Sequence, residues 1–397
     1  MLNLAFILGF VGAALGLLIG ILIFSSVSDA IDCPASISNS TNPNYNTVIN
    51  TISTAVSIQG IAYDPSHNSM YVTGFSQSNL KVIDVNTNTI TGTVSIGVGP
   101  RHIAFASSNN TLWVTRFGDG GTVAVINTTT NLSITNVTVG TDPYAIEYVA
   151  SLNRMYVTNN GGNSVSVIAV NNNTVIATIP VGIGPKGLAY ASSNGTIYVL
   201  NFNPNYISII NTTTNTVIQN ITSIGQVGFL IDIDYDASRN RMYVSNGDAG
   251  DVVNVISVSS ASVIATIPVA NSDMYGIKYS PSNDSIYVGA PSTNATARVY
   301  AIGASTLSIY KAINIIPATN QPQFFDIASN NNIYVTDGGG GGIVYVIDGN
   351  PTVSSGTSWV ATCESTNVST QAAYALLIIS LVVIAAVVIL SIIKMLR

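Results

Sequence analysis

Short runs of alternating hydrophobic and polar residues recur along the middle of the chain. Each run is four to six residues long, is often β-branched, and is bounded by Asn, Gly, Ser or Pro, as in "RMYVTNNGGNSVSVI" at residues 154–168. Alternation over so few residues is typical of short strands joined by tight turns. No helical period appears between residues 46 and 350, so the pattern predicts an all-β domain.

One element of this pattern recurs seven times. It reads "YVTG" at Tyr71, "WVTR" at Trp113, "YVTN" at Tyr156, "YVLN" at Tyr198, "YVSN" at Tyr243, "YVGA" at Tyr287 and "YVTD" at Tyr334, with steps of 42, 43, 42, 45, 44 and 47 residues. Other apolar runs precede and follow each copy, so that the third unit has strands expected at residues 144–150, 154–160, 164–170 and 174–181. Seven units of four strands predict a seven-bladed β-propeller over residues 47–350.

The ends of the repeat region predict how the ring closes. A fourth strand follows the third in each of the first six units but not in the seventh, whereas an extra run, "TVINTI", precedes the first unit at residues 47–52. We expect this N-terminal strand to complete the last blade, because that arrangement leaves no sheet edge unpaired at the seam.

The repeat unit resembles the YVTN family of β-propeller repeats, which is well represented in archaeal surface-layer and cell-surface proteins. The resemblance covers about residues 46–350 and is closest between Met155 and Tyr190, while the "YVGA" unit and the unit that ends near Ile316 depart from it. It implies a propeller at a cell surface. It does not specify a function, because propellers host binding, scaffolding and catalysis alike.

Two uncharged apolar stretches flank the repeats, at residues 5–26 and 372–393. Each has about the 20 residues that cross a bilayer as a helix. We therefore expect transmembrane anchors within residues 1–30 and 372–397, joined to the propeller by extracellular stalks at 31–46 and 351–371. A cleaved signal peptide is the alternative for the first stretch, although no basic residues precede its apolar run.

The membrane orientation follows from positive charge. Lys394 and Arg397 follow the second apolar stretch, and basic flanks stay on the cytoplasmic side. Both termini are then cytoplasmic, with the propeller outside the cell membrane and membrane lipid as a partner. Cys33 and Cys363, the only cysteines, follow and precede the two anchors. A disulfide that joins the stalks is predicted on this oxidising side, with two free thiols as the alternative.

The composition is poor in charge. Only 8% of the residues are charged, where about a quarter is usual, and 42 Asn together with many Ser and Thr supply the polar surface instead. A nucleic-acid partner is not expected, because the 12 basic residues are scattered and the net charge is −6. Few carboxylates also mean little change of charge on acidification, which suits an acid-living archaeon.

N-linked glycans are expected on an exported surface that is so poor in charge. Twelve Asn-x-Ser/Thr sequons provide candidate sites, and seven of them fall in or beside turns of the repeat. The sequons begin at Asn39, Asn109, Asn127, Asn131, Asn136, Asn172, Asn194, Asn211, Asn220, Asn283, Asn294 and Asn367.

The mouth of the central channel is the candidate binding site. The residues that begin the innermost strands are expected to line it, and they suit an anionic ligand or a sugar; the alternative is a rim without a ligand. They are Gln59, Arg101, His102, Tyr144, Lys186, Tyr275 and Gln323. No catalytic residue is predicted, because His102 has no nucleophile paired with it in the sequence. No metal site or cofactor is predicted either, because the two His and two Cys lie far apart.

Together these features predict a non-enzymatic, membrane-anchored surface-layer-like protein with a structural or interaction role. Its partners would be other envelope proteins or further copies of itself. Two alternatives stay open: an adhesion or ligand-binding receptor that uses the channel mouth, and an exported propeller hydrolase or lyase.

Overall fold

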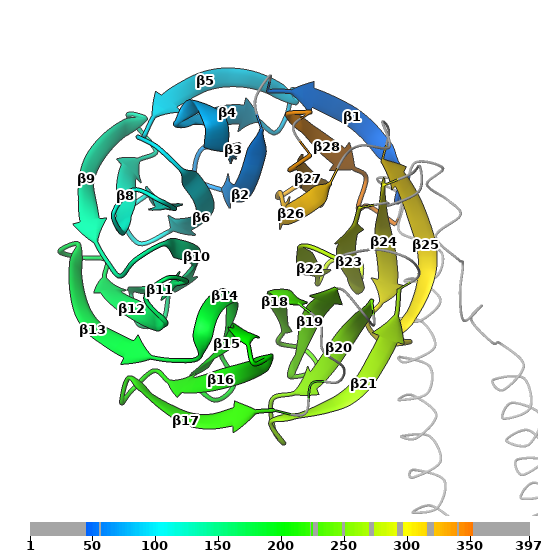
Figure 1. The fold of residues 1–397 in the computed structure, drawn as a ribbon. Helices are drawn as coiled ribbons and strands as arrows, with labels where there is room; N and C mark the ends of the chain where they lie inside the picture. The colour runs from blue at the N-terminus through cyan, green and yellow to red at the C-terminus, as the bar shows by residue number, and fades with distance from the viewer. Residues whose placement is uncertain are drawn as a thin grey trace, which may run out of the picture. The chain divides into compact units, whose positions relative to one another are not determined.

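The computed structural model of the protein describes residues 45–351, apart from 55–56, 223, 225–228, 248–250, 270–273, 292–296, 316–320 and 340. Its strands β1 to β28 form seven four-stranded sheets, arranged as blades around a central axis (Figure 1). The only helical element in this part of the chain is one short 3-10 turn, η1 (Phe75–Gln77). The all-β, seven-bladed propeller predicted from the repeat is confirmed.

The first six blades each take four consecutive strands, from the axis outward. Blade 1 is β2 (Ile58–Asp64), β3 (Ser69–Gly74), β4 (Asn79–Asp84) and β5 (Thr89–Ser95). Blade 2 is β6 (Pro100–Ala106), β7 (Thr111–Arg116), β8 (Thr122–Asn127) and β9 (Leu132–Thr138). Blade 3 is β10 (Pro143–Val149), β11 (Arg154–Asn159), β12 (Ser164–Ala169) and β13 (Thr174–Pro180). These last bounds agree with the predicted strands to within one residue.

The remaining blades follow the same order. Blade 4 is β14 (Ile183–Ala191), β15 (Thr196–Asn203), β16 (Tyr206–Asn211) and β17 (Thr216–Ile221). Blade 5 is β18 (Phe229–Asp236), β19 (Arg241–Gly247), β20 (Val252–Ser257) and β21 (Ser262–Pro268). Blade 6 is β22 (Ile277–Ser280), β23 (Ser285–Ala290), β24 (Ala297–Gly303) and β25 (Ser308–Ile315).

Blade 7 joins the two ends of the ring. It contains β26 (Pro322–Ile327), β27 (Ile333–Asp337) and β28 (Ile343–Ile347), and its outermost strand is β1 (Val48–Ser53). Strand β1 pairs antiparallel with β28, so that Val48 faces Ile347 and Ser53 faces Ile343. The predicted closure by the N-terminal strand is therefore confirmed.

The aromatic residue that begins each repeat motif holds neighbouring blades together. All seven of these side chains are at most 1% exposed: Tyr71, Trp113, Tyr156, Tyr198, Tyr243, Tyr287 and Tyr334. The hydroxyl of Tyr71 donates to Asn131 Oδ1 of the next blade at 3.0 Å, and Tyr287 donates to Asn46 Oδ1 of blade 7 at 2.7 Å. Seven hydrophobic clusters, one at each interface between blades, complete the core.

The high Asn content has a structural cause in the turns. Asn tolerates the left-handed backbone conformation better than most residues, because its short side chain hydrogen-bonds locally. Among the described residues, eleven Asn have positive φ, mainly in turns between strands: Asn46, Asn68, Asn88, Asn110, Asn131, Asn153, Asn163, Asn173, Asn215, Asn240 and Asn331. The repeat therefore uses Asn to turn the chain as well as to solvate it.

The predicted anchors, the stalks, Cys33 and Cys363 lie outside the described residues, so the disulfide and the membrane topology stay predictions. Within the described part of the chain, no helix has the length and apolar character that crossing a membrane requires.

Candidate binding site in the central channel

The recurring Thr or Ser of the repeat positions residues beside the axis. Thr115 Oγ1 accepts the backbone N–H of His102 at 2.9 Å and donates to the carbonyl of Tyr144 in the next blade at 2.9 Å. Ser245 Oγ does the same in blade 5, where it accepts Asp232 N–H at 3.1 Å. These hydrogen bonds are made where the register between the first and second strands of the blade shifts, near the start of the innermost strand. The hydroxyls thus fix the backbone of His102 and Asp232.

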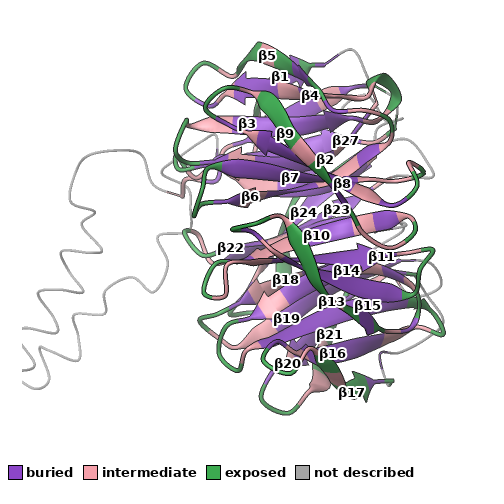
Figure 2. Ribbon diagram, turned by 90° about the vertical axis from the view of Figure 1, so that its left-hand side faces the viewer, coloured by how far each residue is buried: buried purple, intermediate pink, exposed green. Residues whose placement is uncertain are grey.

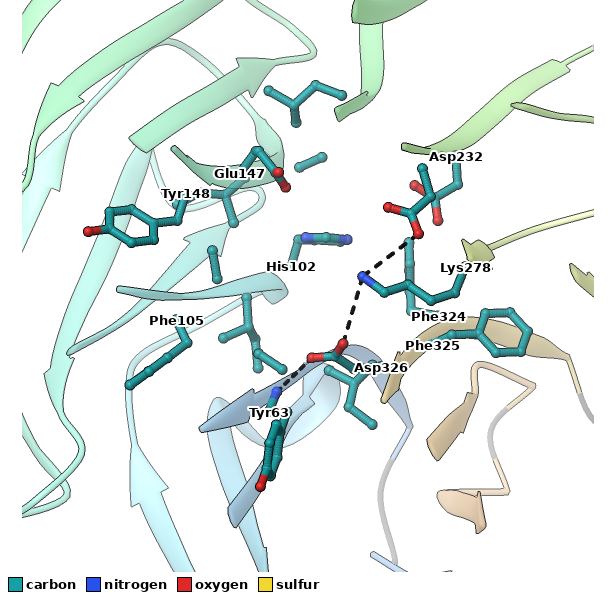
Figure 3. A pocket seen from close by; sticks show the side chains of 18 of the residues that line it. Tyr63, His102, Phe105, Glu147, Tyr148, Asp232, Lys278, Phe324, Phe325 and Asp326 are labelled. Atoms are coloured by element: carbon teal, nitrogen blue, oxygen red, sulfur yellow. Dashed lines mark hydrogen bonds and ion pairs between the residues drawn. The ribbon is translucent and has the colours of Figure 1, made fainter. Parts of the chain in front are cut away.

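A cavity of about 280 Å³ lies at the axis and is lined by residues of all seven innermost strands. We call this cavity the channel. Among its lining residues are the acidic side chains Glu147, Asp232, Asp234 and Asp326 and the basic side chain Lys278. Figure 3 shows Glu147 and His102 on one side of the channel and Lys278 on the other.

Lys278 is paired with two of the four carboxylates. Its Nζ lies 3.7 Å from Asp326 Oδ1 and 4.0 Å from Asp234 Oδ2 (Figure 3). The backbone of a neighbouring blade holds each carboxylate: Tyr279 N–H donates to Asp234 and Tyr63 N–H to Asp326, both at 2.7 Å. The carboxylate of Asp234, above all, raises the pKa of Lys278, so Lys278 is charged. The lysine and these two carboxylates form a positioned ionic group.

Glu147 and Asp232 lack such a cation. Asp232 Oδ2 accepts Ile277 N–H at 3.1 Å, and Glu147 makes no hydrogen bond or ion pair with any described residue. Burial at the axis raises the pKa of Glu147 to about 8 and that of Asp232 to about 7. Both groups therefore titrate near neutral pH instead of at the usual acidic values.

His102 faces the channel as a neutral base. Burial, followed by the charges of Arg101 and Lys278, lowers the pKa of His102 to about 4. Its Nδ1 is buried and has no hydrogen-bond partner among the described residues. The ring lies edge-on to Phe324, with 5.0 Å between the ring centres. This nitrogen is thus free to accept or donate one hydrogen bond.

Of the seven predicted mouth residues, His102 is the one found among the residues that line the channel. Arg101 instead stacks on the ring of Tyr144, with its guanidinium carbon 3.8 Å from the ring centre. Gln323 is buried, and the side-chain oxygen of Gln59 is buried without a described hydrogen-bond partner. The backbone carbonyl of Tyr275 accepts a hydrogen bond from Ser245 at 2.5 Å. Ligand binding by these residues stays a prediction.

Lys186, the remaining predicted residue, lies against an aromatic pair. Its Nζ is 4.5 Å from the ring centre of Phe202 and 5.7 Å from that of Phe229. The two rings stack in parallel, with centres 4.8 Å apart. Burial lowers the pKa of Lys186 to about 8. Stacking on aromatic rings therefore accounts for this side chain without a ligand.

Sequence reasoning missed the acidic residues and Lys278. The signal for them is their position in the strands, because residues two apart on one strand point to the same face of the sheet. Glu147, Asp234, Lys278 and Asp326 occupy one equivalent position of the innermost strands, and Asp232 and His102 occupy the position two residues earlier. The sequence prediction instead placed the first residues of these strands at the channel mouth.

The sequons differ in how far their Asn side chains are available. Those of Asn109, Asn136, Asn172, Asn194 and Asn220 are exposed, and those of Asn127, Asn131, Asn211 and Asn283 are half-buried. The amide nitrogen of Asn283 donates to Tyr287 Oη at 2.8 Å and to the Gly349 carbonyl at 2.9 Å. Asn39, Asn294 and Asn367 lie outside the described residues.

The lining of the channel is suited to binding a polar ligand. It contains no Ser, Thr or Cys, and Lys278 is held in its charged form, which is not nucleophilic. Within the described ranges, no group of three or more His, Cys, Asp or Glu is placed to hold a metal ion. Proton exchange with Glu147, Asp232 and His102 is the chemistry that the channel offers.

Comparison with solved structures shows the fold. The chain is similar to a structure named Kuenenia stuttgartiensis hydrazine synthase, with a TM-score of 0.64 and 15% sequence identity over 74% of this chain and 96% of that one. At this identity the likeness extends to the propeller fold alone. No family model matches the chain, and neither does any curated protein.

Proposed function

We propose that this protein is a membrane-anchored extracellular propeller that binds a small polar ligand in its central channel. The placement of charge carries the proposal. Four of the 18 acidic residues of the chain, including one of its two Glu, line a single cavity together with one of the 12 basic residues. A chain that is otherwise poor in charge concentrates charge at its axis.

The fold itself does not require these charges. At the equivalent positions, blade 1 has Gly60 and Ala62, and blade 4 has Gly187 and Ala189. Removing a carboxylate from water costs several kcal/mol per ion, even after the protein relaxes around it. Perturbed titratable groups that converge on a cavity are typical of a functional site.

Binding is favoured over catalysis because the channel lining offers no Ser, Thr or Cys and no uncharged lysine, and the hydroxyls of Tyr63 and Tyr148 are hydrogen-bonded to Asn68 and Asn153. An exported hydrolase or lyase would need a reacting group positioned against a base. The ligand-binding receptor is thus the better supported of the two alternatives.

Saturation-transfer NMR on the full-length protein tests the channel. The probes are butylammonium, butyrate and butanol, which share one alkyl chain and differ in charge. We expect saturation of at least one probe, and a weaker signal in Glu147→Gln or in Lys278→Met but not in Asp84→Asn, a half-buried residue at the end of β4, away from the channel. Absence of transfer to all three probes would refute channel binding.

The proposed location has its own test. After a high-salt wash, the full-length protein should stay with the membranes of its cells, and a protease added outside intact cells should cut it. A washed protein that is found in the soluble fraction would refute the anchors.

A structural role in the envelope is the second candidate. It is favoured by the rim of the propeller, meaning the surface formed by the outermost strands of the seven blades. Figure 2 shows exposed bands along outermost strands such as β9 and β13. Ten of the 14 large hydrophobic side chains that are exposed in the described chain lie on outermost strands: Ile49, Ile90, Leu132, Ile134, Val175, Ile176, Ile218, Ile264, Ile309 and Tyr310. Lys311 is the only charged residue on these seven strands.

Uncharged apolar edges favour association with another strand edge. If the rim joins copies of the chain, Ile134→Lys combined with Ile176→Lys should lower the average mass in analytical ultracentrifugation. An unchanged mass distribution would refute association through these edges.

A further inference from the structure

The charged groups of the channel fall into two sets: those paired with an opposite charge and those without such a partner. Asp234 and Asp326 each contact Lys278 and accept a backbone N–H from a neighbouring blade. Glu147 has neither kind of partner among the described residues, and Asp232 has backbone N–H partners, Ile277 and Ile233, but no ion pair with Lys278. The groups that await a partner are therefore two carboxyls and the buried nitrogen of His102.

The balance of charge selects the sign of the ligand. Four carboxyls line the channel against one ammonium group, and the imidazole of His102 is neutral because its pKa lies at about 4. An anion would meet unpaired carboxyls, while Lys278 is already placed between two of them. A cation would instead supply the missing partner of Glu147 and Asp232.

The volume of the channel and the residues that line it further narrow the class of ligand. A cavity of about 280 Å³ has room for about nine waters at about 30 Å³ each, and thus for a molecule of similar size. The lining includes Ile61, Ile103, Ile146 and Phe324 beside the charged groups. Such walls accept a short alkyl portion that follows a charged head.

We infer that the ligand is a small organic ammonium ion, whose charged head is held between Glu147 and Asp232 and whose alkyl portion packs on the apolar wall. This inference rests on the proposed channel binding and specifies its ligand. His102 Nδ1 contributes one hydrogen bond to the head or to a polar group beside it. Lys278, held by Asp234 and Asp326, repels a second cation.

Binding releases a proton. Without an ammonium ligand, Glu147 keeps its proton up to a pH of about 8, because burial raises its pKa. The arriving ammonium group stabilises the carboxylate, so the carboxylic acid gives its proton to solvent and forms an ion pair with the unchanged ligand cation. The charged side chains that face Glu147 across the channel are Asp232, Asp234, Asp326 and Lys278, and the titratable ring of His102 lies on the same side as Glu147 (Figure 3).

The affinity should therefore rise with pH. The free carboxylate is the form that binds, and its share grows tenfold for each pH unit below the pKa of Glu147. Between pH 6 and pH 8 the affinity for an ammonium ion should rise by about 50-fold, because the ionised share of Glu147 grows from about 1% to about half. It should fall again only when the ligand amine loses its own proton, near a pH of about 10.

Isothermal titration of the full-length protein with butylammonium, butyrate and butanol tests this inference. We expect butylammonium to bind, with at least tenfold higher affinity at pH 8 than at pH 6. Titrations in two buffers of different ionisation enthalpy should show release of up to one proton at pH 7. In Glu147→Gln the affinity at pH 8 should fall at least tenfold and the proton release at pH 7 should fall to the share of Asp232, whose pKa is about 7, while Asp84→Asn should match the wild type.

The outcomes separate this inference from the proposed function. Binding of butyrate or butanol without butylammonium, weakened by Lys278→Met, would leave channel binding standing and refute the cationic class. Binding of butylammonium that is unchanged in Glu147→Gln would refute the assigned position. If none of the three probes binds, both proposals fail together.

Discussion

The substitution Glu147→Gln should stabilise the protein above neutral pH. An unfolded Glu ionises near pH 4.5, whereas burial in the channel raises the folded pKa to about 8. The folded state therefore binds more protons between these two values, and its stability falls as the pH rises from 4.5 to 8. Glutamine has the shape of the protonated acid and cannot ionise, so this loss should disappear in the variant.

The size of the effect follows from the two pKa values. Raising the pKa from 4.5 to about 8 corresponds to at most about 5 kcal/mol once the pH exceeds 8. Water in the channel screens part of this, so we expect a gain of about 2 to 3 kcal/mol at pH 8.5. At pH 4 the wild-type residue is protonated in both states, and the two proteins should be equally stable.

Urea unfolding of the full-length protein at pH 4 and at pH 8.5, followed by tryptophan fluorescence, measures this difference. Trp113 is a suitable reporter because it is completely buried in blade 2. Asp84→Asn is a control of opposite sign: hydrogen bonds from Thr87 lower the pKa of that half-buried residue's carboxyl, so the substitution should cost stability at pH 8.5. Equal stability of Glu147→Gln and wild type at pH 8.5 would refute the raised pKa.

Three further substitutions or measurements test the ring and its surface. Thr158→Val removes a hydroxyl that accepts Ala145 N–H at 2.9 Å and donates to the Lys186 carbonyl at 2.8 Å, so it should lower the free energy of unfolding in urea by about 2 kcal/mol. Thr158→Ser keeps the hydroxyl and should cost little; equal losses of stability in the two variants would refute the role of the hydroxyl. Gly289→Ala would place a Cβ 2.2 Å from the Pro322 carbonyl oxygen of the next blade, so its melting temperature should drop, whereas Gly92→Ala, with 3.4 Å to the nearest atom, should melt like wild type; similar melting of both variants would contradict this close approach. Glycopeptide mass spectrometry of the native protein should find sugar on exposed Asn109 and Asn172 but not on Asn283, whose amide nitrogen is engaged; a glycan on Asn283 would contradict that assignment.

The fold could be predicted because each of the seven repeats carries the same strand pattern. The buried Tyr156 and Val157 recur in equivalent form in almost every unit, so seven weak strand patterns reinforce one another. The closing strand β1 could be predicted by counting, since one unit lacks a fourth strand and one strand precedes the first unit. Local pattern and ring closure agree at every blade.

The site could be predicted only in part, because it arises where the repeats differ. His102 was found because it stands at the start of an innermost strand. Glu147 and Lys278 lie on strands β10 and β22, which are separated by more than 100 residues in the sequence. Their convergence on one cavity depends on the curvature of the whole ring, which the pattern of any single blade does not encode.

A crystal structure of the full-length protein grown at pH 8.5 with butylammonium tests the central claim most directly. It should show the ammonium nitrogen within about 3 Å of a Glu147 carboxylate oxygen, the usual hydrogen-bond distance, on the side of the channel that faces Asp232. A channel that holds only water at saturating butylammonium, or a ligand bound away from Glu147, would contradict the claim.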